Sequence, residues 1–252
     1  MIEEKISFIN RYNNKLVGIK TKPNPNISKY PTIILVHGFG VDKEDSGIFT
    51  QLASFLSENN YITFRFDFTG CGESQGDYSE ITLTRLKEDL EDIINFVKNN
   101  EYIDIDKIGI VGQSYGSATT IVLNPQIKTI ILTSSGLARK NELIESFGEG
   151  YNPNGLSKRK RSNGSITIIS NIVFNDLNNY NLLKDIQKIK IPVLFIYGSK
   201  DTISHYNASK ELFSNCISKD KAILVFDMDH SWNNKRDEVN REILKWFNKY
   251  CI

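Results

Sequence analysis

The sequence has few cysteines, almost no net charge and no long apolar run. Its three cysteines, at positions 71, 216 and 251, are odd in number, far apart and without a CxxC pair. This spacing predicts neither a disulfide framework nor a zinc site, and we expect free thiols in a reducing compartment. Because 31 basic residues nearly balance 30 acidic ones, no general field would attract nucleic acid or an acidic membrane.

The sequence also lacks a candidate membrane span and a candidate secretory signal. No apolar stretch approaches a spanning length, and the segment MIEEKISFINRYNN has no continuous apolar core. We therefore expect a cytoplasmic protein without membrane insertion. The 252 residues, 40% of them hydrophobic, suffice for one sizeable core, so we predict one domain spanning residues 1–252.

Short runs of β-branched and aromatic residues alternate with helical patterns along the chain. The runs lie at 32–37, 61–68, 108–112, 129–133, 193–197 and 222–226. They are almost continuously apolar, which is typical of strands buried on both faces of a parallel sheet. Helical periodicity occupies 83–97 and 236–250, and the runs KISFIN and KLVGIK in the first 22 residues indicate an antiparallel hairpin. The pattern predicts an α/β fold with a doubly wound, mostly parallel sheet.

One connection is much longer than the others. Roughly 55 residues separate Thr133 from Pro192, where a few residues would be usual. The segment holds the turn-rich runs GYNPNG and SKRKRSNG, the alternating run SITIISNIVF and the helical run NLLKDIQKIK. We predict a small cap insertion over about 137–188.

The cap carries two features with open interpretations. Its large apolar side chains either line a substrate pocket or form the core of the cap itself: Phe147, Tyr151, Ile172, Phe174 and Tyr180. The basic run at 158–161 either steers a carboxylate-bearing substrate or a partner, or is a solvated loop.

The run IVGQSYGSA places Ser114 between a predicted buried strand and a short predicted helix. A sharp turn of this kind projects its middle side chain from the sheet edge, and Gly112 and Gly116 would allow strand and helix to approach closely. Ser114 is therefore a candidate nucleophile; the alternative is a small residue in a tight turn. The helix start would favour an oxyanion, with Tyr115 offering its backbone N–H.

A nucleophilic serine also requires a second oxyanion donor and a base, and candidates for both lie at other strand ends. The turn HGFG at 37–40 follows a buried run, and Phe39 is the candidate for the second N–H. We expect His37 to hold this loop by a hydrogen bond. Of the other two histidines, His230 follows the last strand and is the candidate base, whereas His205 is read as a surface residue.

The base needs a carboxylate that orients its ring. Asp201 directly follows the strand VLFIY, which gives the chain order Ser114, Asp201, His230. This order is expected of the triad on a doubly wound sheet. Asp227 and Asp229 are too near to His230 in sequence and are predicted to form its loop.

Five segments in order resemble the α/β-hydrolase superfamily over nearly the whole chain: HGFG at 37, DFTGCGES at 67, GQSYG at 112, YGSKD at 197 and DH at 229. The cap and the stretch LLKDIQKIKIPVLFIYGSKD look most like small serine esterases of the feruloyl, cinnamoyl and monoacylglycerol types. The resemblance implies hydrolysis of a small-molecule carboxylic ester without cofactor. Phe39 replaces a glycine of the lipase-type HGGG sequence, which argues against bulky tertiary-alcohol esters.

Other functions of this fold stay open. A monoacylglycerol lipase, a lysophospholipase or an acyl thioesterase would use the same triad. A prolyl oligopeptidase-type peptidase would need a gating domain for which the chain lacks room. A non-catalytic binding protein would keep the fold alone. The oligomeric state and the role of the cap are not determined by the sequence.

Overall fold

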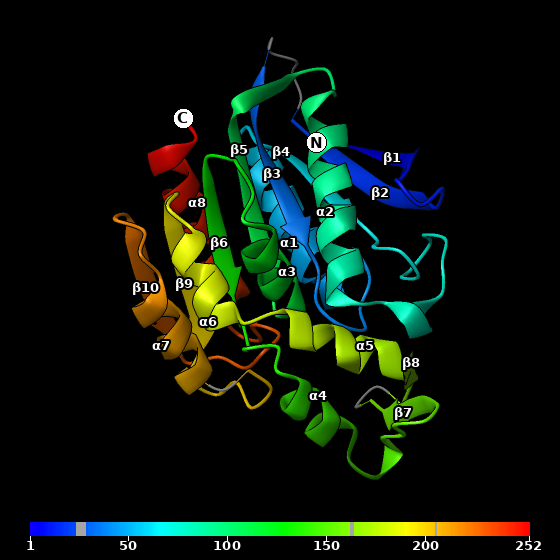
Figure 1. Cartoon of the computed structure of the whole chain (residues 1–252). Coiled ribbons are helices and arrows are strands. Elements are labelled where there is room, and N and C mark those ends of the chain that lie inside the picture. Colours follow the sequence, from blue (N-terminus) through cyan, green and yellow to red (C-terminus); the bar gives the residue numbers. More distant parts are fainter. Residues whose placement is uncertain (24–28, 162–163, 205) are drawn as a thin grey trace.

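The computed structural model describes residues 1–23, 29–161, 164–204 and 206–252. Within these ranges eight strands form one sheet in the order β1-β2-β4-β3-β5-β6-β9-β10 (Figure 1). Their bounds are β1 Ile2–Ile9, β2 Lys15–Lys22, β3 Tyr30–Val36, β4 Ile62–Phe66, β5 Ile103–Gln113, β6 Thr129–Thr133, β9 Val193–Gly198 and β10 Lys221–Phe226. The six strands from β4 to β10 in this order are parallel to one another, whereas β2 pairs antiparallel with both β1 and β4. The predicted fold class and the N-terminal hairpin are confirmed.

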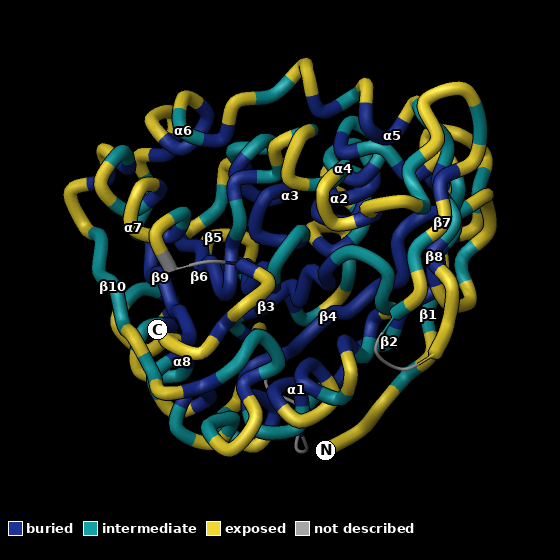
Figure 2. Tube along the Cα trace, turned by 90° about the horizontal axis from the view of Figure 1, so that it is seen from below, coloured by how far each residue is buried: buried dark blue, intermediate teal, exposed yellow. Residues whose placement is uncertain are grey.

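Burial explains the apolar pattern of the strands. Every residue of β4, β6 and β9 is buried, because helices cover both faces of the sheet centre (Figure 2). The edge strand β1 instead alternates exposed and half-buried residues. An edge strand with one free face needs apolar side chains only at every second position.

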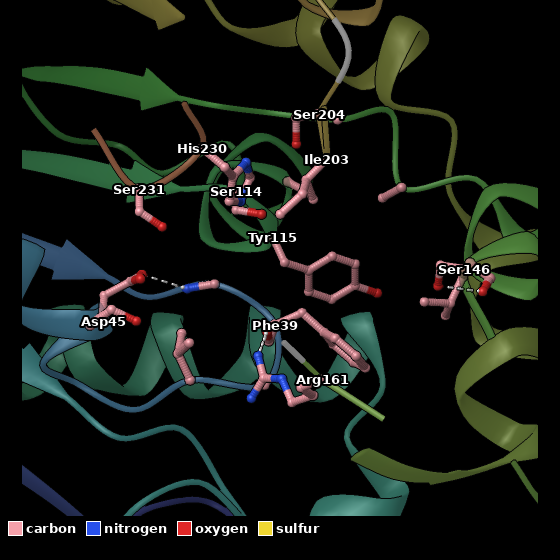
Figure 3. Close-up of a pocket in the computed structure, with 18 of the residues that line it drawn as sticks. Phe39, Asp45, Ser114, Tyr115, Ser146, Arg161, Ile203, Ser204, His230 and Ser231 are labelled. Carbon is pink, nitrogen blue, oxygen red and sulfur yellow. Dashed lines mark hydrogen bonds between the residues drawn. The ribbon is translucent and has the colours of Figure 1, made fainter. Parts of the chain in front are cut away.

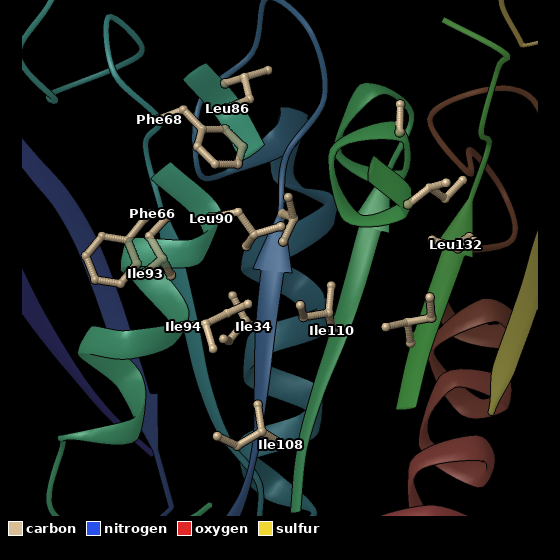
Figure 4. Packing of buried hydrophobic residues seen from close by; sticks show 14 of the residues in the cluster. Ile34, Phe66, Phe68, Leu86, Leu90, Ile93, Ile94, Ile108, Ile110 and Leu132 are labelled. Carbon is tan, nitrogen blue, oxygen red and sulfur yellow. The ribbon is translucent and has the colours of Figure 1, made fainter. Parts of the chain in front are cut away.

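Helices cover both faces of the sheet. One face carries α1, Ile48–Glu58, and α8, Arg236–Tyr250. The opposite face carries α2, Leu83–Lys98, α3, Tyr115–Leu123, and α7, Tyr206–Asn215. Figure 4 shows α2 directing Leu86, Leu90 and Ile93 toward the central strands. Full burial of one such side chain contributes about 1.5–3 kcal/mol.

The segment between β6 and β9, here called the insertion, contains α4 Lys140–Phe147, β7 Leu156–Lys160, β8 Ile166–Ser170, α5 Asn171–Asp176 and α6 Leu182–Asp185. β7 and β8 form an antiparallel pair of their own. The turn predicted at SKRKRSNG is wrong for its first half, which belongs to β7. The alternating run SITIISNIVF is strand only up to Ser170, after which α5 begins, and Val173 and Phe174 of α5 are buried in one cluster with Phe147 and with Ile169 of β8.

The helical run NLLKDIQKIK forms less α-helix than its pattern suggests. After four residues of α6 the chain tightens into a 3₁₀ turn, Ile186–Lys188. Ile186 and Ile189 are both fully buried. A spacing of three residues brings two side chains to the same face in a 3₁₀ turn.

The aromatic residues of the insertion form its own core. Phe147 and Tyr151 pack edge-on against Phe174, with ring centroids 5.4 and 4.9 Å apart. Ile172 is 49% exposed, and the Tyr180 hydroxyl lies 2.7 Å from Thr84 Oγ1. Of the two interpretations given for these residues, the packing favours an insertion core for Phe147, Tyr151 and Phe174. Ile172 and Tyr180, which packs on the main core, fit neither interpretation. No helix in the described ranges combines the length and apolar character of a membrane span.

Candidate active site

Ser114 occupies a strained turn at the carboxyl end of β5. Its φ of 55° and ψ of −116° are rare for a residue with a side chain. A Cβ on Gly116 would lie 2.0 Å from the carbonyl oxygen of Val36, and one on Gly112 would lie 2.8 Å from that of Gly116. The predicted need for glycine on both sides of Ser114 is therefore confirmed.

A pocket of about 660 Å³ opens above this turn, a volume typical of small-molecule sites (Figure 3). Ser114 and His230 both line it. So do Phe39 and Tyr115, whose rings meet edge-on with centroids 5.5 Å apart. The HGFG turn with the following residues 41–46, α3, the loops after β9 and β10, and the insertion supply the rest of the wall.

His230 is held by a buried carboxylate. Its Nδ1 lies 2.8 Å from Oδ2 of Asp201, whose side chain is 1% exposed. The other oxygen, Oδ1, accepts hydrogen bonds from the backbone N–H groups of Ile203 and Ser204, at 2.9 and 2.8 Å. Donation from Nδ1–H leaves Nε2 of His230 with its lone pair, which is the form that can accept a proton.

Of the two acids closest to His230 in sequence, Asp229 serves the histidine loop, as predicted, whereas Asp227 bonds to the loop after β9. Asp229 accepts hydrogen bonds from the backbone N–H groups of Ser231 and Asn233. Asp227 pairs with Lys200 at 2.9 Å. Both carboxylates are therefore satisfied by neighbours other than the imidazole ring.

Gln113 ties the serine turn to the histidine loop, a role that the sequence analysis missed. Its Nε2 donates to the carbonyl oxygen of His230 at 2.8 Å, and its Oε1 accepts from the Thr133 hydroxyl at 2.5 Å. Ser114 N–H donates to the Thr133 carbonyl oxygen at 2.9 Å. No signal in the sequence marks Gln113, because the pattern GxSxG leaves its position free.

The HGFG turn lies directly against Ser114. A Cβ on Gly38 would lie 3.2 Å from Ser114 Cβ and 3.7 Å from its Oγ. Within the described ranges, neither Phe39 nor Tyr115 donates its backbone N–H to a protein acceptor. Both predicted oxyanion donors are thus backbone groups of segments that meet at Ser114.

His37 fixes the turn, as predicted. Its Nε2 accepts from Phe68 N–H at 3.2 Å, so Nδ1–H donates to the Gly38 carbonyl oxygen at 2.9 Å. Burial lowers the pKa of His37 below its ordinary value, which keeps the ring neutral.

The neighbouring loop that begins at Asp67 also has a structural role, since Asp67 is buried and accepts a hydrogen bond from Lys43 Nζ at 2.8 Å. Cys71 in the same loop is buried, and burial raises the pKa of its thiol.

Asp45 is a second residue that the sequence analysis missed. It lines the pocket, yet is only 6% exposed, and its Oδ2 accepts from Gly38 N–H at 3.1 Å (Figure 3). Burial raises the pKa of Asp45 to about 6, although the Gly38 hydrogen bond and nearby His230 lower it. The surrounding sequence VDKEDSG resembles any polar loop and gives no indication of burial.

Alternate residues of the basic run at 158–161 line the pocket. Arg159 and Arg161 line the cavity, whereas Lys158 and Lys160 are exposed. The interpretation as a solvated loop is wrong for the two arginines. Pairing of β7 with β8 fixes the direction of Arg159, and the backbone N–H of Arg161, just beyond β7, donates to the Ser165 carbonyl oxygen at 2.8 Å. His205 lies outside the described residues. Among the described residues, no group of three or more His, Cys, Asp or Glu side chains could hold a metal ion.

The sheet order, the serine turn and the surrounding strand ends define an α/β-hydrolase. The family described as serine aminopeptidase, S33, matches residues 28–154, half of the chain, and the chain belongs to this family. It is thus a hydrolase of the α/β-hydrolase superfamily.

Solved structures of the same fold include two that cover almost all of the chain. Est1E from Butyrivibrio proteoclasticus, with bound ferulic acid, has a TM-score of 0.84 and 19% identity over 97% of this chain and 98% of that one. The α/β hydrolase GrgF from Penicillium sp. sh18 has a TM-score of 0.81 and 17% identity over 100% and 99% of the two chains. At these identities the likeness concerns the fold alone.

Two sequence relatives also match most of this chain. The uncharacterized protein YfhR of Escherichia coli O157:H7 is 25% identical over 251 residues, covering 95% of this chain and 78% of YfhR. The mitochondrial palmitoyl-protein thioesterase ABHD10 of Bos taurus is 24% identical over 221 residues, covering 83% and 70%. One relative thus has no assigned reaction and the other is a thioesterase by name.

Proposed function

We propose that the protein hydrolyses carboxylic esters with short or aryl acyl groups through an acyl-enzyme on Ser114. The observation that carries the proposal is the arrangement around one pocket. It combines a serine in a strained strand-to-helix turn with a histidine whose Nδ1 lies 2.8 Å from a buried carboxylate. These are the parts that nucleophilic acyl transfer requires.

In the proposed reaction Ser114 Oγ attacks the ester carbonyl while His230 Nε2 accepts its proton. Asp201 holds the ring and stabilises the imidazolium that forms. The backbone N–H groups of Phe39 and Tyr115 hold the oxyanion, and each such donor typically contributes about 100-fold to 1000-fold in rate. His230 then protonates the leaving alcohol, and a water activated by the same ring releases the acid.

The pocket suits an acyl group of moderate size. Its apolar wall includes Phe39, Tyr115, Leu143 and Ile203, and its volume of about 660 Å³ would hold an aryl or short alkyl chain. The ferulic acid complex of Est1E supports aryl acids as candidates.

The test is hydrolysis of p-nitrophenyl esters from acetate to palmitate, together with methyl ferulate, by wild type and Ser114→Ala. We expect turnover of short or aryl esters that falls by at least about 1000-fold in the variant, because the nucleophile is lost. Full activity in Ser114→Ala would refute the scheme. So would the absence of both turnover and labelling of Ser114 by a fluorophosphonate.

An acyl thioesterase is the second candidate, because the relative ABHD10 is a thioesterase by name. Matched oxygen and sulfur esters of one acyl group separate the two functions through the ratio of their kcat/KM values.

A kcat/KM that is highest for long acyl chains would instead favour a monoacylglycerol lipase or lysophospholipase. Amino-acid p-nitroanilides test the aminopeptidase activity that the family description names. The single domain with a cap over about 137–188 stays a prediction. The cytoplasmic location of the protein is likewise still a prediction.

A further inference from the structure

Two guanidinium groups of the insertion face the pocket that holds Ser114. They belong to Arg159 in β7 and Arg161 just beyond it, and both are half-buried. Lys158 and Lys160, which alternate with them, are exposed to solvent. The alternation along residues 158–161 therefore separates four positive charges, two toward the cavity and two toward water.

Neutral and aromatic groups hold the two arginines in place. Arg159 Nη1 donates to Ser146 Oγ at 2.8 Å, and its guanidinium carbon lies 5.1 and 5.9 Å from the ring centroids of Phe147 and Phe39. Arg161 Nη2 donates to the Phe39 carbonyl oxygen at 3.3 Å (Figure 3). These contacts fix the direction of both groups without neutralising their charge.

Neither arginine forms an ion pair within the described part of the chain, where every salt bridge lies between other residues. A guanidinium has five N–H donors, so most donors of each group stay available. Burial lowers the pKa of Arg159 most, and the positive charge of neighbouring Arg161 lowers it further. Holding two uncompensated cations together in a half-buried site is unfavourable unless an anion joins them.

The carboxylates that line the pocket have their own partners. Glu44 pairs with Arg65 at 3.1 Å, and Glu142 lies 3.6 Å from Arg139. Asp45 accepts from Gly38 N–H, and Asp42 accepts from the backbone N–H of Glu44. These acids are therefore not the counter-ions of the two arginines.

We propose that the pocket selects esters that carry an anionic oxygen group, a carboxylate or a phosphate, and that Arg159 and Arg161 bind it. The inference rests on the proposed function, because it assigns the substrate class of the same site. Both guanidinium groups match the geometry of carboxylate and phosphate oxygens. This anionic group is a substituent of the substrate and is distinct from the oxyanion that forms at the attacked carbonyl.

The test measures binding to the Ser114→Ala protein, which does not consume the ligand. One pair compares monomethyl adipate with dimethyl adipate, and the other compares 1-butyrylglycerol 3-phosphate with 1-butyrylglycerol. We expect the anionic member of at least one pair to bind about 10-fold to 100-fold more tightly, with the advantage shrinking at high salt. The pair that shows it identifies the anion as a carboxylate or a phosphate.

The variants Arg159→Gln and Arg161→Gln, alone and together, should remove this preference while keeping a hydrogen-bond donor at each position. The control variants Lys158→Gln and Lys160→Gln remove the same charge from the outer face of the strand. They should keep the preference for the anionic ligand. Equal binding of both members in both pairs would overturn the proposal without any variant. A preference that survives the double arginine change, or falls equally in the lysine variants, would also overturn it. Because no turnover is needed, failure of ester hydrolysis in the wild type is a separate result.

Discussion

Replacing Asp45 by asparagine should change how stability depends on pH. The carboxyl group is 6% exposed, and burial raises its pKa from 3.8 to about 6. Such a group favours the folded state when protonated, so its contribution is fully present below pH 3.8 and is lost as the pH rises to about 6. The difference between the two values corresponds to about 3 kcal/mol.

Asparagine should remove this loss without removing the contact. Its amide oxygen can accept the hydrogen bond from Gly38 N–H that Asp45 Oδ2 accepts at 3.1 Å. The backbone φ of 43° at position 45 is also tolerated by asparagine. We therefore expect Asp45→Asn to match the wild type near pH 4 and to exceed it by about 3 kcal/mol near pH 7.

The assay is urea unfolding of both proteins at several pH values between 4 and 8. Other titrating groups are common to the two proteins and cancel in the difference of their free energies of unfolding. Asp106→Asn is a matched control, because Asp106 is exposed and its difference from wild type should be flat. A pH-independent difference for Asp45→Asn, or a less stable variant at pH 7, would refute the reasoning.

Two further substitutions test the architecture of the site. Gly116→Ala should lower the free energy of unfolding by about 2–3 kcal/mol, because its Cβ would lie 2.0 Å from the Val36 carbonyl oxygen; Gly136→Ala, whose Cβ would meet only ordinary contacts, is the control in the same urea experiment. Asp201→Asn should leave the thermal midpoint nearly unchanged but lower kcat for p-nitrophenyl acetate by about 1000-fold or more, since the amide no longer enforces the Nδ1–H tautomer of His230. An Asp201→Asn enzyme within about 10-fold of wild type in kcat would argue against a triad.

The sheet was predictable because its signal is local. Buried parallel strands such as β6 and β9 require apolar residues on both faces, so each appears as a short, continuous apolar run. The candidate site followed from the same runs, since parallel strands bring their carboxyl ends to one edge. Ser114, Asp201 and His230 each lie within four residues of the end of such a run; their catalytic roles stay predictions.

The insertion was harder to predict because short elements carry weak patterns. The run SITIISNIVF begins with alternation and is rich in β-branched residues, yet the chain turns into α5 after Ser170. Burial of Val173 and Phe174 against Phe147 decides the change, and that contact joins residues far apart in sequence. Tertiary packing overrides local propensity most easily in segments of this length.

The sequence by itself determined the fold class, the hairpin, the helices at 83–97 and 236–250, and the glycines that the turn at Ser114 requires. These features depend on neighbouring residues, whose spacing is visible in the chain. Only the tertiary structure decided that Asp45 is buried beside Gly38 and that Arg159 and Arg161 face the cavity. Alternation along a strand shows that two sides differ, but which side meets a distant pocket depends on how the insertion packs against the sheet.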